Sequence, residues 1–222
     1  MSIRSLLTLA PGVAAAAVAV PALAGLTTPF AVGSYLGAAA PESTADYDVQ
    51  WFETADYVSL TESDGAGSTV NVAALFSATG FSHLSNFNLA DGMHGSTFVS
   101  ARLAAQSGGS FNMSWSWSGL VGKDASWLVL DAATGDIVLG LEVSGGTFTT
   151  WGLKGGDYFG STYATLVEGE YIVLSTMSDA GPVTGSSGFA SVVWEFTPIP
   201  APGALALAGL AGVAGLAGRR RR

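Results

Sequence analysis

The sequence predicts an all-β fold, an antiparallel β-sandwich of jelly-roll-like type, between two short apolar ends. From Tyr47 onward, short runs rich in Val, Thr and aromatic residues alternate with clusters of Gly, Ser and Asp, which is the pattern of strands joined by turns. No segment of this middle part keeps a helical period for three turns. Cysteine is absent, so the core must hold the domain together without disulfides.

The run 111–118 is the clearest predicted strand. Apolar side chains occupy every second position and Asn or Ser the positions between them, and a period of two places the two sets on opposite faces. Trp115 and Trp117 share their face with Phe111 and Met113. We therefore expect these two tryptophans to lie in the core, and not on a sugar-binding surface.

Two further strands are expected at 127–130 and 137–143, because the segment 131–136 between them carries the Asp and Gly of a tight hairpin. The remaining predicted strands are 47–52, 69–76, 97–104, 147–153, 171–176 and 189–196. Residues 25–45 show no sustained period, so they are expected to be a flexible lead-in. The sandwich domain is accordingly placed at residues 46–197.

The charge of the chain is distributed very unevenly. All 17 acidic residues lie between Glu42 and Glu195, together with three of the eight basic ones, which leaves a side-chain charge of −14 for the middle. An acidic surface repels phosphate backbones, so nucleic acid is excluded as an expected partner. Cations and neutral polymers fit such a surface better.

Residues 1–24 have the anatomy of a secretory signal peptide. Arg4 gives a positive head, residues 6–20 are an apolar stretch that we expect to be helical, and Ala22 and Ala24 are the small residues that signal peptidase reads. Cleavage is expected between Ala24 and Gly25, with residues 38–40 as a later candidate. The alternative is an N-terminal anchor that is retained.

Residues 198–222 predict a membrane anchor at the other end. Prolines stop the last strand, residues 203–218 are apolar throughout, and Arg219, Arg220, Arg221 and Arg222 follow. As a single helix the apolar segment would reach about 24 Å, slightly less than the ~30 Å hydrocarbon core. The arginines place the C-terminus on the cytoplasmic side, so the domain is expected outside.

This tail resembles the PEP-CTERM sorting signal of Gram-negative bacteria, which combines a short proline motif, one weak transmembrane helix and a terminal arginine cluster. The family motif V-P-E-P aligns with Ile199, Pro200, Ala201 and Pro202, so that Ala201 stands where the family has Glu. The resemblance implies recognition by an exosortase, placement at the cell surface and association with exopolysaccharide or biofilm matrix. A plain C-terminal anchor without processing predicts the same topology.

Candidate binding residues are few. His83 and His94, with Asp91 nearby, could hold a metal, but a metal site needs more ligands at tighter spacing, so ordinary surface histidines are expected. Acidic pairs could bind Ca²⁺ in loops, although Asp is also the usual turn residue and no cofactor is expected. These pairs are Asp46 and Asp48, Glu62 and Asp64, and Asp131 and Asp136.

Trp151 precedes the Gly-rich segment 152–160, so it is expected to be the most exposed tryptophan and the candidate for stacking against a sugar ring. Enzyme signatures such as G-x-S-x-G, H-E-x-x-H or a P-loop are absent from the sequence. Three hypotheses remain: a non-catalytic surface or matrix protein, a carbohydrate-binding module, which could depend on Ca²⁺, and a secreted glycoside hydrolase.

Overall fold

The computed structural model describes residues 25–53, 57–105, 108–118, 124–144, 147–151, 159–181 and 186–199. The expected signal segment 1–24, and the tail from Pro200 to Arg222, lie outside these residues. A folded unit spans Ala24–Pro198. No helix in the described ranges is both long and apolar enough to cross a bilayer.

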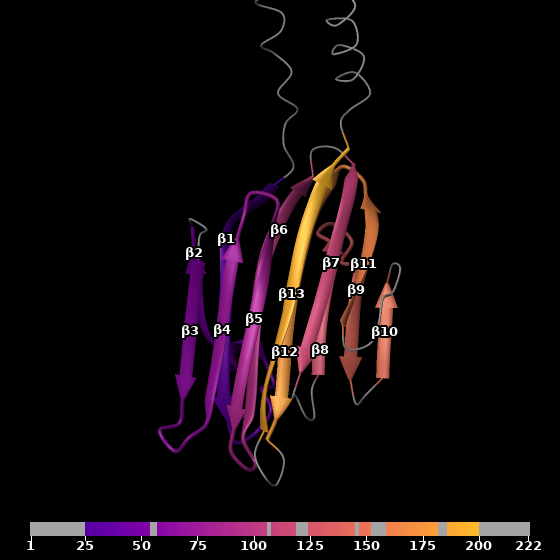
Figure 1. Ribbon diagram of the computed structural model, residues 1–222. Coiled ribbons are helices and arrows are strands. Elements are labelled where there is room, and N and C mark those ends of the chain that lie inside the picture. Colours follow the sequence, from indigo (N-terminus) through magenta and orange to yellow (C-terminus); the bar gives the residue numbers. More distant parts are fainter. Residues whose placement is uncertain are drawn as a thin grey trace, which may run out of the picture. The chain divides into compact units, whose positions relative to one another are not determined.

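Two antiparallel sheets pack face to face, as the sequence predicts (Figure 1). Sheet A has seven strands, in the order β10 (Thr147–Trp151), β9 (Ile137–Ser144), β8 (Asp124–Asp131), β12 (Gly169–Ala180), β6 (His94–Ala105), β1 (Gly25–Gly37) and β2 (Asp48–Phe52). Sheet B has six, in the order β11 (Phe159–Leu166), β7 (Gly109–Ser118), β13 (Ser186–Pro198), β5 (Gly80–Leu89), β4 (Thr69–Phe76) and β3 (Tyr57–Ser63).

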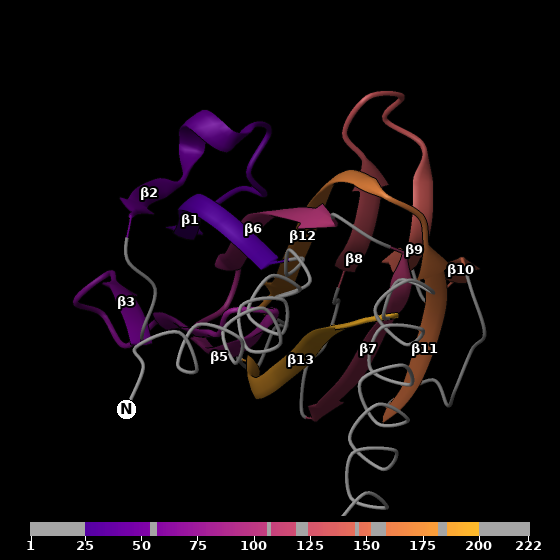
Figure 2. The same ribbon diagram turned by 90° about the horizontal axis from the view of Figure 1, so that it is seen from above.

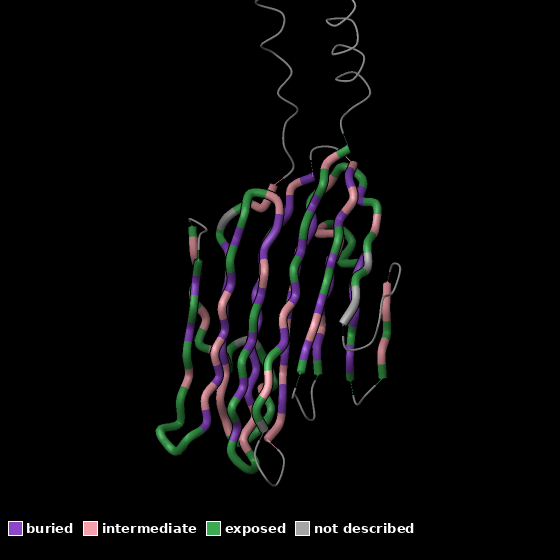
Figure 3. Tube along the Cα trace, viewed as in Figure 1, coloured by how far each residue is buried: buried purple, intermediate pink, exposed green. Residues whose placement is uncertain are grey.

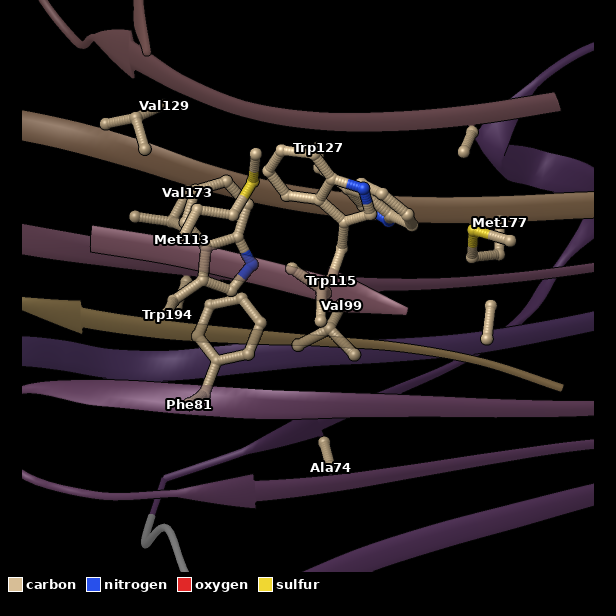
Figure 4. Close-up of a cluster of buried hydrophobic side chains, with 14 of the residues drawn as sticks. Ala74, Phe81, Val99, Met113, Trp115, Trp127, Val129, Val173, Met177 and Trp194 are labelled. Carbon is tan, nitrogen blue, oxygen red and sulfur yellow. The ribbon is translucent and has the colours of Figure 1, made fainter. Parts of the chain in front are cut away.

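The core lies between the sheets, because buried and more exposed residues alternate along the strands (Figure 3) and most of the buried ones are apolar. Trp115 and Trp117 of β7 are buried in it, which confirms their assignment to the core. Trp127 of β8 lies against both, with ring centroids 6.2 Å and 5.3 Å away. The close-up in Figure 4 shows Trp115, Trp127 and Trp194 among these side chains.

The expected hairpin between β8 and β9 is present. The Asp131 N–H donates to the Asp136 carbonyl at 2.9 Å, and the Gly135 N–H donates to the Asp131 carbonyl at 2.8 Å. Gly135 has φ +77°, a conformation that glycine adopts without steric cost. The turn chemistry of this short segment was therefore sufficient to locate it.

The expectation of a flexible lead-in at residues 25–45 is wrong for most of that segment. Residues 25–37 form β1, which pairs with β6 on one side and β2 on the other. Phe30, Ala31 and Val32 are buried. The strand was hidden by its many small residues and by Pro29, which lies where the register shifts between Thr27 and Ala31, a tolerated place for a residue without an N–H.

Three other strands, β3, β5 and β11, were also not expected. In β5 the inward positions are Phe81, His83, Ser85, Phe87 and Leu89. Two polar side chains in the middle of the inward face interrupt the apolar alternation. The sequence pattern therefore did not predict a strand in this segment. The domain therefore begins about twenty residues earlier than predicted, and it contains more strands.

Candidate functional site

The outer face of sheet A carries the main candidate site. On β6, Val99, Ala101 and Leu103 point into the core, so Phe98 and Ser100 must point outward, away from sheet B. Figure 2 shows the connection from β1 to β2 and the connection from β8 to β9 standing on this outer side, on either side of β6 and β12.

A hollow of about 630 Å³ lies over four adjacent strands of this face. Its floor includes Ala31 of β1, Ser100 of β6 and Leu174 of β12, and Trp51 of β2 stands at its edge. The wall is the segment between β1 and β2, which contains the short 3-10 helix η3 (Thr44–Asp46). The hollow is more apolar than polar, as is usual for a small-molecule site.

Hydrogen bonds hold this wall in place. The Asp46 carboxylate accepts from the backbone N–H groups of Glu42 and Ser43, both at 2.8 Å. The Tyr35 hydroxyl donates to the Ala39 carbonyl at 2.7 Å. Because these bonds form without a ligand, the wall is preorganised, which lowers the entropic cost of binding.

Three aromatic side chains, Tyr47, Trp51 and Phe98, line the hollow. The Tyr47 hydroxyl lies 2.6 Å from the Ser96 hydroxyl, and its ring meets the Phe98 ring edge to face at 5.1 Å. Burial raises the pKa of Tyr47, so its hydroxyl stays protonated at neutral pH. Trp51 is 68% exposed. A large flat ring left in water beside fixed aromatic side chains is a typical stacking platform.

Trp51 also borders a second hollow, of about 480 Å³, that contains Pro29, Arg102 and Ile172. The tryptophan therefore stands as a ridge between two concave regions of one sheet face. Ser100 of β6 also lines both hollows.

The described lining residues of the main hollow include few ionisable groups. Among its described lining residues, Glu42 is the only carboxylate. Cleavage of a glycosidic bond ordinarily requires two carboxyl groups on opposite sides of the bond. The arrangement can bind a ligand through ring stacking and hydroxyl contacts.

Trp151, the tryptophan singled out from the sequence, is half-buried at the end of edge strand β10. Most of the Gly-rich segment that follows it lies outside the described residues. Trp51 is the more exposed of the two, and sequence reasoning did not single it out. Its run, Asp48 to Phe52, reads as an ordinary strand, and local sequence does not reveal that this strand ends the sheet.

The expectation that both histidines lie on the surface is wrong for His83. Its side chain is 1% exposed, between the sheets. Its Nδ1 lies 2.6 Å from the Ser175 hydroxyl, and its Nε2 lies 2.9 Å from the Ser85 hydroxyl and 3.1 Å from that of Thr97. Burial lowers the pKa of His83 to about 3. This is a structural cluster that joins the sheets, because no substrate can reach it.

His94, the other histidine, is half-buried at the start of β6. It borders a hollow of about 290 Å³ together with Asp124 and Asp179. Ala125 and Met177 belong to the core, so by strand alternation Asp124 points outward and Asp179 inward. Within the described ranges, no group of three or more His, Asp or Glu side chains could hold a metal ion.

One member of each acidic pair serves a turn. Asp64 accepts from the backbone N–H groups of Ala66 at 2.7 Å and Ser68 at 2.9 Å. The bond from Ala66 is the main cause that lowers the pKa of the Asp64 carboxyl. Asp131 likewise accepts from the Ala133 N–H at 2.8 Å. With Asp46 in the wall of the hollow, these carboxylates act as backbone acceptors, which is the ordinary role of Asp in turns.

No family model matches the chain, and no curated protein matches it. The enzymatically active domain of tailspike protein 4 from bacteriophage CBA120 is similar, with a TM-score of 0.27 and 12% identity over 75% of this chain and 19% of that one. A family 35 carbohydrate-binding module from Clostridium thermocellum has a TM-score of 0.22 and 20% identity over 62% of this chain and 90% of the module. The chain thus spans under a fifth of the tailspike domain, and scores this low carry no argument about function.

Proposed function

We propose that the chain is an exported cell-surface or matrix protein whose sandwich is a non-catalytic carbohydrate-binding domain. The observation that carries the proposal is Trp51, an exposed ring at the edge of a preformed hollow that Tyr47 and Phe98 also line. Sugar rings offer an apolar face to an aromatic ring and hydroxyls to its polar neighbours. One carboxylate, Glu42, among the described lining residues supports binding without cleavage.

Export is proposed from the ends of the sequence. Gly25 begins β1, so cleavage between Ala24 and Gly25 leaves every described strand intact. Cleavage after Ala40 would remove β1, which pairs with two neighbours and contributes Phe30 and Val32 to the core. The fold therefore favours the earlier processing position for signal peptidase.

Surface placement is proposed from the tail, with recognition by an exosortase at Ile199 to Pro202 and retention by the apolar segment and the arginines.

The sandwich is proposed to be jelly-roll-like. In support, consecutive strands from β5 to β8, and again from β10 to β13, alternate between the two sheets.

Replacement of Trp51 tests the binding function. We expect Trp51→Ala to weaken binding to a neutral polysaccharide by about tenfold or more, because an aromatic side chain that anchors a ligand contributes roughly 2 kcal/mol. The matched control is Tyr57→Ala, which removes a ring that is 65% exposed on β3 of the opposite sheet. Affinity electrophoresis in gels of hydroxyethylcellulose, mixed-linkage β-glucan and galactomannan measures both variants against the unmodified domain.

Retardation in at least one gel, lost in Trp51→Ala and kept in Tyr57→Ala, supports the proposal. Absence of retardation in all gels, or equal retardation of both variants and the unmodified domain, contradicts it. Released reducing ends after incubation with the same polymers would instead indicate a hydrolase.

A further inference from the structure

The register of sheet A connects the Trp51 site to a more distant tryptophan. Trp51 of β2 pairs with Ala31 of β1, and Ala31 pairs with Ser100 of β6. Ser100 in turn pairs with Leu174 of β12. Paired residues in neighbouring strands lie side by side on one face, so these four side chains form a row that crosses the strands at the floor of the main hollow.

The same row continues to the other edge of the sheet. Leu174 pairs with Leu128 of β8, Leu128 with Gly140 of β9, and Gly140 with Trp151 of β10. The row therefore begins at a tryptophan on one edge strand and ends at a tryptophan on the other. The five residues between them are small or aliphatic, and none of the seven is ionisable. Ala31, Leu128 and Gly140 are buried, so the row is open to a ligand mainly at Ser100, Leu174 and the two tryptophans.

Trp151 faces the same side as Trp51. Phe148, three residues earlier on β10, packs against the core and stacks on Trp117 with ring centroids 6.0 Å apart. An odd separation along a strand reverses the direction of the side chain, so Trp151 points outward. Gly140 beside it brings no side chain of its own, and the Leu128 side chain lies against that position.

The length and the chemistry of this row restrict what it can bind. Trp51 and Trp151 are six strand spacings apart, which is about 29 Å along a sheet with ~4.8 Å between strands. A monosaccharide or disaccharide cannot reach both rings. An uncharged row within a domain that carries 17 acidic and three basic side chains suits a neutral ligand, because a polyanion would be repelled.

We infer that the outer face of sheet A binds an extended neutral polysaccharide chain that crosses the strands, with one sugar ring stacked on Trp51 and another on Trp151. This inference rests on the proposed carbohydrate-binding function and adds the form of the ligand: an internal stretch of a polymer, not a chain end or a small sugar. The two tryptophans act as separate anchors at the two edges of one sheet.

The inference is tested with the secreted domain 25–198 and four variants: Trp51→Ala, Trp151→Ala, Trp151→Phe and Tyr57→Ala. The probes are the neutral polysaccharide that the domain retains and oligosaccharides of increasing length from the same polymer, starting at the disaccharide. Calorimetry gives the affinities, and thermal unfolding shows that each variant is folded. Trp151→Phe keeps a stacking ring, so it separates the ring from the packing of this half-buried position.

We expect affinity to rise with chain length beyond the tetrasaccharide. Trp51→Ala and Trp151→Ala should each weaken binding of the polymer by about tenfold, whereas Trp151→Phe and Tyr57→Ala should change it less than threefold. Binding of the disaccharide should depend on Trp51 alone. Polymer binding that is lost in Trp51→Ala but unchanged in Trp151→Ala overturns this inference and leaves the proposed function standing. If neither tryptophan matters, both fail.

Discussion

His83 is a buried base that the fold keeps neutral. Its two ring nitrogens both meet hydroxyl groups, from Ser175 on β12 and from Ser85 and Thr97 on β5 and β6. A neutral imidazole has one donor and one acceptor nitrogen, and hydroxyl groups can serve either. A charged imidazolium would lie buried between the sheets, with hydroxyl groups as its hydrogen-bond partners among the described residues, and burial is costly for a charged group.

Stability should therefore depend on His83 protonation. The pKa of His83 is about 3 in the folded state against 6.5 for the ordinary side chain, so only the unfolded chain takes up this proton below pH 6.5. The contribution of neutral His83 to the free energy of unfolding is fully present above pH 6.5 and is lost progressively as the pH falls toward about 3. We expect the free energy of unfolding to decrease by about 2 kcal/mol from this group between pH 6.5 and 5, measured by urea denaturation.

The control for this prediction is His83→Gln, which keeps a donor and an acceptor but does not titrate. The variant should be less stable at pH 7, and its stability should fall less steeply on acidification, by the same 2 kcal/mol. An equally steep loss in wild type and variant would show that other groups, such as the acidic surface residues, cause the pH dependence.

A second prediction at the level of single residues concerns Gly33 of β1. A Cβ atom at this position would overlap the ring of Phe98, which lines the main hollow. We expect Gly33→Ala to destabilise the domain by about 1–3 kcal/mol and to weaken polysaccharide binding, because the ring must move. Gly169→Ala is the control, since its Cβ would be 3.7 Å from Tyr171, an ordinary contact; equal thermal stability and binding of the two variants would contradict the prediction.

At the level of elements, β1 is the strand that completes the site. It joins β2 to β6, so it connects the strand that carries Trp51 to the rest of sheet A. It also places Ala31 on the floor of the hollow and begins the connection that forms the wall. Without β1, sheet A would end at β6, because β2 is joined to the sheet through β1.

We therefore expect a domain that starts at Gly25 to fold and one that starts at Pro41 to remain unfolded. The shorter chain lacks Phe30 and Val32 of the core and leaves one side of β6 unpaired, a loss beyond the 4–5 kcal/mol that is already exceptional for one substitution. Circular dichroism and thermal unfolding compare the two chains. A cooperative transition in the shorter chain would contradict the prediction. In a separate measurement, N-terminal sequencing of the processed protein should find Gly25 first.

The elements differ in how well local sequence revealed them. β7 and the β8–β9 hairpin were predicted because strict alternation and an Asp–Gly turn are local signals. β5 was missed because His83 and Ser85 occupy inward positions, and their polar character is tolerated only through partners on sheet A. The wall of the hollow was missed for a related reason, since it is held partly by the long-range contact between Tyr47 and Ser96.

At the level of the whole molecule, charge is separated between the acidic sandwich and the arginines of the tail. This separation supports the proposed topology, because arginines next to an apolar segment resist transfer across a bilayer. Replacement of Arg219, Arg220, Arg221 and Arg222 by Gln should reduce the membrane-associated fraction of the exported protein by more than half. Cell fractionation with antibody detection measures this fraction.

The matched control for the tail is Arg102→Gln, which removes a positive charge from the exposed face of β6. It should leave the membrane-associated fraction unchanged. The topology would be contradicted if the four tail substitutions had no effect, or if the intact chain were recovered from the cytosol with residues 1–24 still attached.

Composition and short-range pattern determined the all-β class, the core position of Trp115 and Trp117 and the turn roles of Asp64 and Asp131. These properties depend on neighbours a few residues apart. Only the tertiary structure decided that Trp51 is exposed while Trp194 is buried. Both lie in similar apolar runs, but β2 ends sheet A and β13 lies inside sheet B. The position of a strand within its sheet is set by pairing between distant segments, and local sequence does not encode it.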